Sequence, residues 1–197
     1  MATGAGEYEA IILAAGSGSR FGGGKLLAPW RGGVLLDGAL AAALAAPVGR
    51  VIVVTGADGE KVAQAARDFA GDRIVLVHAD DHAEGMGASL RRGAGELSPG
   101  CAGAFVLLGD MPRIPHAILA PLIAALEAGA PAAAPVFAGQ RGHPALIGAE
   151  LLPQLLTLGG DAGARAILKG LGERLALVEA QGDGVLFDVD ERDDLSR

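Results

Sequence analysis

The residues best suited to bind an anion lie together near the start of the chain, at positions 14–25. This stretch contains five glycines, two serines, Arg20 and Lys25, and it directly follows a short apolar run at residues 10–13. Glycine lets the backbone turn tightly so that successive N–H groups point at an anion. Arginine grips phosphate oxygens with two parallel hydrogen bonds, and lysine adds a point charge. The stretch therefore predicts a loop that holds phosphate groups at the end of a buried strand.

Two common phosphate-binding motifs do not fit this loop. The Walker motif ends in Gly-Lys-Ser/Thr, whereas Lys25 is followed by Leu26. The dinucleotide-binding fingerprint Gly-x-Gly-x-x-Gly is missed by one position, because the third glycine after Gly16 and Gly18 is Gly22. The alternative is a surface turn with incidental charges, but a strand, glycines, arginine and lysine in this order favour a phosphate site.

A carboxylate follows another apolar run of the chain. Gly109 and Asp110 come directly after residues 103–108, which have the composition of a buried strand. A carboxylate at a strand end, beside a phosphate loop, is a suitable ligand for Mg²⁺ bound to a nucleotide. The alternative is an aspartate that forms an Asx turn before a helix. The phosphate loop favours the metal role for Asp110.

Two more carboxylates, Asp188 and Asp190, lie near the end of the chain in an expected extended segment, residues 185–190. In a strand both side chains point to the same face, where a cation relieves their repulsion. Alternatively, Asp190 caps a helix that starts at Glu191. We expect at least one of the two carboxylates to bind metal.

Gly85 and Ser89 lie where a polar loop enters an expected helix at residues 88–97. Backbone groups and a hydroxyl at such a place could hydrogen-bond a nucleobase edge or a ribose. The alternative is that they only cap the helix.

Two basic motifs in the second half of the chain could face an acceptor. Arg141 and His143 belong to an Arg-Gly-His-Pro sequence between two apolar segments. His143 is an acid–base group, a phosphate contact or a hydrogen-bonded scaffold residue. Asp161 is a natural N-cap for the following helix, and Arg165 is expected to pair with it or to reach an acceptor phosphate.

Strands and helices alternate along the chain, which is typical of a parallel α/β sheet. The expected fold class is therefore α/β, a single-domain Rossmann-like three-layer sandwich with a mostly parallel sheet over residues 1–197. Ligands of such sheets bind beyond the carboxyl ends of the strands, where these polar motifs lie. The expected strands are residues 10–13, 50–55, 73–77, 103–108, 132–137, 142–147 and 174–179; the expected helices are 34–46, 58–70, 88–97, 115–127, 149–158 and 162–170, with a hairpin at 26–33 and a charged helix at the end.

Composition narrows the class of protein further. The 197 residues are 51% hydrophobic and 20% charged, with a net charge of −7, which excludes a disordered chain and general affinity for nucleic acid or anionic membranes. The single cysteine, Cys101, cannot form an internal disulfide, and without an evident secretory signal a cytoplasmic setting is expected. His78, His82 and His116 are too scattered to predict a zinc site.

Taken in order, six motifs resemble the bacterial molybdenum cofactor cytidylyltransferase family, part of the MobA-like nucleotidyltransferase group. The motifs are LAAGSGSRFGGGK, GMGASLRRG, LLGDMP, RGHP, GDAGAR and DVDERDDL, and the resemblance covers residues 9–195. It implies a GT-A-like nucleotidyltransferase fold and transfer of CMP from Mg-CTP to the terminal phosphate of molybdopterin, with release of pyrophosphate. The product would serve a molybdenum hydroxylase.

The resemblance also assigns roles to residues. Arg20, Lys25 and Asp110 would be catalytic, and Asp110 and Asp190 would hold Mg²⁺. Arg141, His143, Asp161 and Arg165 would bind the acceptor. The nucleotide would be bound by Leu13, Ala14, Ala15, Gly16, Gly18, Arg20, Lys25, Gly85, Ser89 and Gly109.

Two details of the first motif bear on its assignment. Ala15 stands where guanylyl-transferring relatives have a second glycine, which points to CTP. The three glycines before Lys25 depart from the usual pattern, in which a more polar residue precedes the lysine.

Three alternatives remain open from the sequence. The acceptor is another phosphorylated compound, such as a sugar or polyol phosphate; or the protein is a non-catalytic carrier that delivers cofactor to a hydroxylase. A redox enzyme with a nicotinamide cofactor is disfavoured, because the fingerprint spacing fails.

Overall fold

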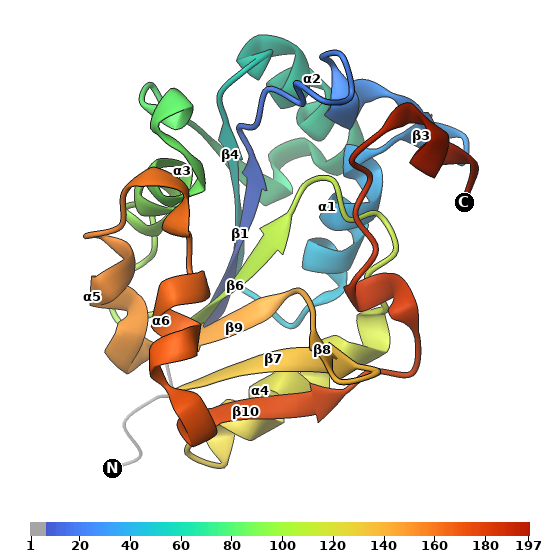
Figure 1. Ribbon diagram of the computed structural model, residues 1–197. Coiled ribbons are helices and arrows are strands. Elements are labelled where there is room, and N and C mark those ends of the chain that lie inside the picture. The colour runs from blue at the N-terminus through green and yellow to red at the C-terminus, as the bar shows by residue number, and fades with distance from the viewer. Residues whose placement is uncertain (1–6) are drawn as a thin grey trace.

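The computed structural model describes residues 7–197 and shows a central eight-stranded sheet between two layers of helices (Figure 1). The strand order is β10-β7-β9-β6-β1-β4-β5, and β8 pairs with β7. A separate two-stranded hairpin joins β2 (Pro29–Trp30) to β3 (Gly33–Val34), as predicted. The strands of the main sheet are β1 (Tyr8–Ala14), β4 (Arg50–Thr55), β5 (Ile74–His78), β6 (Gly103–Leu108), β7 (Ala132–Phe137), β8 (Gln140–Arg141), β9 (Ala145–Gly148) and β10 (Leu175–Glu179).

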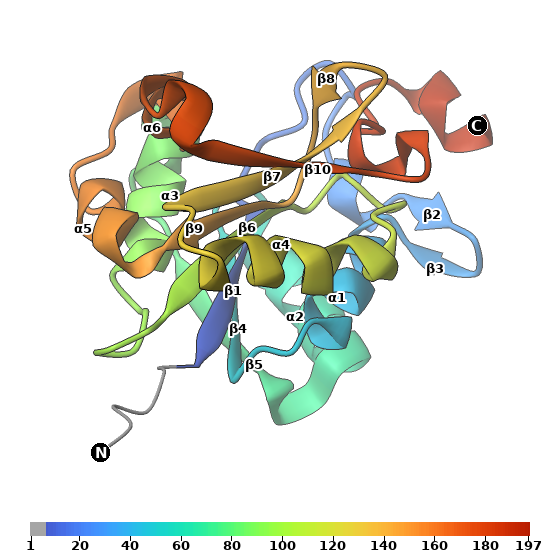
Figure 2. The same cartoon turned by 90° about the horizontal axis from the view of Figure 1, so that it is seen from below.

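Helices cover both faces of the sheet (Figure 2). One face packs against α1 (Leu36–Ala45), α2 (Gly59–Ala70) and α4 (Leu119–Glu127). The other packs against α3 (Met86–Ala94), α5 (Leu152–Leu155) and α6 (Arg165–Gly170). The predicted α/β three-layer fold with a mostly parallel sheet is confirmed. Between residues 7 and 197, no helix has the length and apolar character needed to cross a bilayer.

The central strands are apolar throughout because both of their faces are buried. Ile11 and Ile12 of β1 are fully buried, and they belong to the two separate cores on opposite faces of the sheet. This explains why the run at residues 10–13 shows no alternation of apolar and polar side chains.

The order of the strands reverses beside β1. The chain passes from β1 to β4 and β5 on one side, then returns to β6 on the other side, and both neighbours of β1 run parallel to it. A crevice that can bind ligands opens at such a switch point. The glycine-rich loop follows β1 and Asp110 follows β6, so both lie at this crevice (Figure 1).

The predicted strand at residues 142–147 was wrong. The chain instead forms β8 and β9 with a break at residues 142–144, and β9 runs antiparallel to β6 and β7. At Gly142 the backbone passes so close to Val185 that a Cβ would lie 2.2 Å from the Val185 carbonyl oxygen. Pro144 has no N–H to donate to a neighbouring strand.

The predicted strand at residues 185–190 was wrong as well. It forms the end of a 3₁₀ helix, Asp183–Val185, and an extended segment that pairs with no strand of the described sheet. Its side chains nevertheless alternate, with Phe187 and Val189 buried and Asp188 and Asp190 exposed. The segment after it is a 3₁₀ helix, Arg192–Ser196, rather than an α-helix.

Two predicted helices are shorter than expected. Residues 149–158 form a 3₁₀ helix, Ala149–Leu151, followed by the single turn of α5, with Pro153 in that first turn. Residues 162–170 form α6 only from Arg165 onward, because Gly163 has a φ of +48° that no right-handed helix contains.

Candidate active site

The glycine-rich loop after β1 folds back on itself and holds Lys25. The Gly23 N–H donates a hydrogen bond to the Gly18 carbonyl at 3.1 Å. Gly18 has a φ of +58°, and a Cβ there would lie 2.9 Å from the Lys25 Cβ. Glycine is therefore required at this position, both for the left-handed backbone and for the close approach of the lysine.

Lys25 lies between two of the predicted carboxylates. Its Nζ is 2.6 Å from Asp110 Oδ2 and 3.7 Å from Asp190 Oδ1. The Lys25 and Asp110 side chains are only 14% and 23% exposed, so water screens this ion pair less than a surface pair. Arg20 is 3.3 Å from Asp190 but 78% exposed, and it is the outermost member of the group.

Backbone contacts bring Asp110 and Asp190 together from distant parts of the chain. The Gly109 N–H donates to the Leu13 carbonyl at 2.9 Å, which fixes the loop after β6 against β1. The Val189 N–H donates to the Asp110 carbonyl at 3.1 Å. The C-terminal segment is thus bound directly to the residue whose carboxylate Lys25 contacts.

Aromatic packing holds the same segment in place. Phe187 lies against Trp30 of the hairpin, with ring centroids 6.1 Å apart, and the Arg113 guanidinium stacks 4.4 Å from the Phe187 ring centroid. Arg192 stacks 4.7 Å from the ring centroid of Phe21, a buried residue of the glycine-rich loop. These contacts fix the C-terminal segment both to the hairpin and to the phosphate loop.

The carboxylates are close enough to affect one another. Burial, followed by the charges of Asp110 and Asp190, raises the pKa of Asp188, while Lys25 acts in the opposite direction. Residues 7–197 contain no group of three or more histidine, cysteine, aspartate or glutamate side chains arranged to hold a metal ion.

A cavity of about 510 Å³ opens beside Lys25 and Asp110. It runs from the glycine-rich loop to the turn that precedes α3. Predicted nucleotide-binding residues make up much of its lining: Leu13, Ala15, Gly16, Gly18, Lys25, Gly85 and Ser89.

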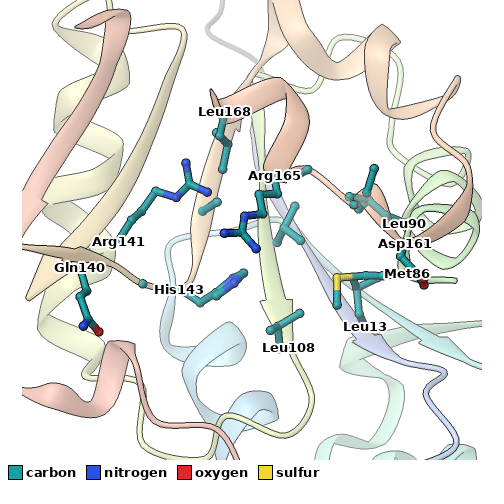
Figure 3. Close-up of a pocket in the computed structure, with 16 residues that line it drawn as sticks. Leu13, Met86, Leu90, Leu108, Gln140, Arg141, His143, Asp161, Arg165 and Leu168 are labelled. Atoms are coloured by element: carbon teal, nitrogen blue, oxygen red, sulfur yellow. The ribbon is translucent and has the colours of Figure 1, made fainter. Parts of the chain in front are cut away.

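A second cavity of about 680 Å³ adjoins the first (Figure 3). The four predicted acceptor residues, Arg141, His143, Asp161 and Arg165, all line it. Figure 3 shows Arg141, His143 and Arg165 in one part of this cavity and Asp161 in another, near Met86. The two cavities share four lining residues, Leu13, Met86, Leu108 and Asp161.

The His143 side chain carries a buried polar atom. Its Nδ1 is shielded from solvent and has no hydrogen-bond partner among the described residues. Burial lowers the pKa of His143, and Arg141 lowers it slightly further, whereas Asp110 raises it. The imidazole is therefore held in its neutral form and adds no positive charge to the second cavity.

Two predicted helix caps were wrong. Asp161 lies in a 3₁₀ helix, Gly160–Ala162, and the N-cap of α6 is Ala164. Glu191 rather than Asp190 caps the last 3₁₀ helix, in a capping box with Asp194. The backbone N–H groups of Glu191 and Asp190 lower the pKa of Asp194. Freed from capping, the side chain of Asp190 points to the ion-pair group instead.

Comparison with known proteins places this arrangement in a family. Residues 10–178 match the family described as the MobA-like NTP transferase domain. The chain belongs to this family. As a MobA-like domain it is a nucleotidyltransferase by family, and the sequence-based assignment to this group is confirmed.

Relatives of known name cover almost the whole chain. The molybdenum cofactor cytidylyltransferase of Escherichia coli (strain K12) is 29% identical over 94% of this chain and 92% of its own. The nicotine blue oxidoreductase of Paenarthrobacter nicotinovorans is 31% identical over 95% of this chain and 94% of its own.

A solved structure agrees with the fold of this MobA-like domain. The crystal structure of Rv0371c from Mycobacterium tuberculosis H37Rv superposes with a TM-score of 0.84 at 27% identity, over 98% of this chain and 97% of that one. A further crystal structure of Rv0371c is a complex with manganese.

Sequence reasoning missed several residues that line the first cavity. His82 and Ala83 belong to a 3₁₀ helix, His82–Glu84, in the loop that follows β5, and Met86 begins α3. The signal that could have revealed them is their place after a buried parallel strand, beside Gly85 and Ser89.

Proposed function

We propose that this MobA-like domain transfers CMP from Mg-CTP to the terminal phosphate of molybdopterin and releases pyrophosphate. One observation carries the proposal: two adjoining cavities share their lining, and the Lys25–Asp110 pair lies at the first of them. One cavity suits a nucleoside triphosphate and the other an anionic acceptor. The likeness to the molybdenum cofactor cytidylyltransferase of E. coli supports this choice of substrates.

The reaction needs positioning and charge stabilisation more than a strong base. An oxygen of the acceptor phosphate, already ionised at neutral pH, forms a bond to the α-phosphorus of CTP. The bond from that phosphorus to the bridging oxygen breaks, and pyrophosphate leaves with the electron pair. Lys25 and the N–H groups of the glycine-rich loop stabilise the charge on the transferring phosphoryl group, and Arg20 covers the leaving oxygens.

The acceptor cavity combines apolar walls with cationic groups. Leu90, Val106 and Leu168 line it, and Arg141 and Arg165 supply the positive charge. This combination suits a ligand with a flat organic body and a phosphate. Neutral His143 lies between the apolar and cationic parts and orients the ligand by hydrogen bonding.

The carboxylates fit a magnesium ion. Mg²⁺ is usually held by one or two carboxylates together with substrate phosphates, so a cage of three protein ligands is not required. Asp110 and Asp190 would hold the ion, and the repulsion that raises the pKa of Asp188 marks the place as one where a cation is favourable. The ion would neutralise phosphate charge and fix the triphosphate.

A second candidate function follows from the likeness to a nicotine blue oxidoreductase, which is 31% identical. It would be a redox enzyme that uses a nicotinamide cofactor. The glycine spacing of the loop does not match the dinucleotide fingerprint, and the carboxylates beside Lys25 would repel a pyrophosphate without a cation. Oxidation of NADH or NADPH by the purified protein would support this alternative.

The test is pyrophosphate release from CTP, GTP and ATP, each with Mg²⁺, with and without molybdenum cofactor. Release with CTP that depends on the cofactor supports the proposal. Release with a sugar or polyol phosphate in place of the cofactor would move the protein to another acceptor. Binding of CTP and cofactor without release would instead identify a delivery protein for a molybdenum hydroxylase.

A further inference from the structure

The two ends of the first cavity differ in chemistry, on the proposed function that it takes a nucleoside triphosphate. Lys25 and Asp110 lie at one end, where phosphates and metal are favourable. The other end is the turn before α3, lined by His82, Gly85 and Ser89. Because the triphosphate occupies the cationic end, the base lies beside the turn before α3.

His82 supplies the aromatic ring at this end, and one ring nitrogen is already engaged. Its Nδ1 lies 3.0 Å from the Ala79 carbonyl oxygen. A carbonyl only accepts hydrogen bonds, so Nδ1 carries the proton. In the neutral ring, the lone pair is then on Nε2, which is an acceptor.

Packing fixes the direction of that acceptor. A Cβ on Gly56 would lie 2.6 Å from His82 Cγ and 2.8 Å from Ala15 Cβ, so the ring and Ala15 sit side by side against the Gly56 backbone. With Nδ1 turned to Ala79 and Cγ against Gly56, the edge of the ring left to line the cavity is the one that carries Nε2.

We infer that His82 determines base specificity by accepting a hydrogen bond from the exocyclic amino group of cytosine. Cytosine presents an N–H donor at position 4, whereas uracil presents a carbonyl oxygen there. The Nε2 lone pair attracts the donor and repels the carbonyl. A site built around such a hydrogen bond selects against the analogue that lacks the donor. His82 therefore separates CTP from UTP.

The test measures equilibrium binding of CTP and of UTP by calorimetry at pH 8, with Mg²⁺ and without acceptor. Variant His82→Phe keeps a ring but loses the acceptor. His78→Phe is the matched control, because the His78 ring centroid lies only 6.1 Å from that of His82 and yet His78 does not line the cavity. Variant His82→Ala replaces His82→Phe if circular dichroism shows that the larger ring prevents folding.

The wild-type protein is expected to bind CTP about tenfold more tightly than UTP, which corresponds to one well-made hydrogen bond. His82→Phe should reduce this ratio to about twofold, chiefly through weaker binding of CTP, and His78→Phe should leave it unchanged. An unchanged ratio in His82→Phe, or an equal loss in His78→Phe, overturns the inference.

The failure of this inference is distinct from the failure of the proposed function. No acceptor is present, so a wrong assignment of the acceptor does not change the ratio. Wild-type protein that binds neither nucleotide overturns both. Wild-type protein that binds CTP and UTP equally overturns only the role of His82.

Discussion

Lys25 contacts two carboxylates at once, and these contacts define the centre of the site. With its Nζ 2.6 Å from Asp110 and 3.7 Å from Asp190, the ammonium is held where a triphosphate would enter. An ammonium in this position neutralises one carboxylate charge in the free protein. When nucleotide and metal are bound, the same charge is available to the phosphoryl group.

Substituting Lys25 by methionine keeps the length of the side chain and removes its charge. Turnover in pyrophosphate release is expected to fall by about 10²–10³-fold, because a preorganised cation at the transition state is lost. Lys61→Met, on the exposed face of α2, is the matched control and should keep wild-type turnover. Equal turnover in both variants would remove Lys25 from the catalytic group.

His143 makes the stability of the protein depend on pH. Burial lowers its pKa in the folded state below the ordinary 6.5, so the unfolded chain binds a proton that the folded protein does not. The stability contribution is therefore complete above about pH 6.5 and decreases as the pH falls below that value.

The corresponding measurement is urea unfolding at pH 7.5 and pH 5.5. His143→Asn should lose less free energy of unfolding between these two pH values than the wild-type protein. His116→Asn removes an exposed histidine and should behave like the wild type. A His143→Asn variant with the wild-type difference would show that another group accounts for the pH dependence.

Helix α1 approaches the loop that carries Asp110 through Gly38. A Cβ at this position would lie 2.4 Å from the carbonyl oxygen and 2.5 Å from the Cα of Pro112, two residues after Asp110. Backbone atoms cannot yield as a flexible side chain can. The glycine in the helix therefore allows the loop after β6 to rest directly on α1.

Gly38→Ala is expected to destabilise the protein by about 1–3 kcal/mol, even though alanine is the better helix former. Pyrophosphate release should fall as well, because Asp110 shifts with Pro112. Gly170→Ala, at the end of α6, has no atom within 4 Å of the added Cβ and should be neutral or slightly stabilising. Thermal unfolding of both variants decides the point, and a stable Gly38→Ala would contradict the close packing.

The extent to which the sequence predicted these elements follows from what determines each of them. The buried parallel strands β1, β4 and β6 were predicted because an uninterrupted apolar run needs only local composition to be recognised. The direction of β9 depends on its neighbours β6 and β7, which no local pattern encodes.

The candidate site shows the same division. Gly18, Lys25 and Asp110 follow strands and were predicted, whereas His82 was missed because its place in the cavity depends on packing against Gly56. The alternation at residues 185–190 correctly indicated which side chains are buried. It could not show that the segment pairs with no strand of the described sheet, since Val189 bonds to the loop at Asp110 instead.

At the scale of the whole molecule, the last part of the chain completes the site. The family match ends at residue 178, and the segment after it carries Asp190. This segment packs Phe187 and Val189 into a small core with Phe21, Trp30 and Leu35. Sequence far from the glycine-rich loop thus fixes both the loop and a carboxylate beside it.

Phe187→Ala should lower the free energy of unfolding by about 3 kcal/mol or more, since a buried aromatic ring is lost. In protein that remains folded, pyrophosphate release should require a higher Mg²⁺ concentration, because Asp190 is no longer held beside Lys25. Phe69→Ala, a 40% exposed ring on α2, is the control and should have a much smaller effect on stability and none on Mg²⁺ dependence. Equal effects in the two variants would mean that the C-terminal core does not position Asp190.

The most direct test of nucleotidyl transfer follows the phosphorus atoms of CTP. The protein is incubated with Mg²⁺, molybdenum cofactor and CTP labelled at either the α- or the γ-phosphate. The account predicts that the α-label joins the cofactor and that the γ-label leaves as pyrophosphate. Transfer of the γ-label to the cofactor, or release of both labels without any transfer, would contradict it.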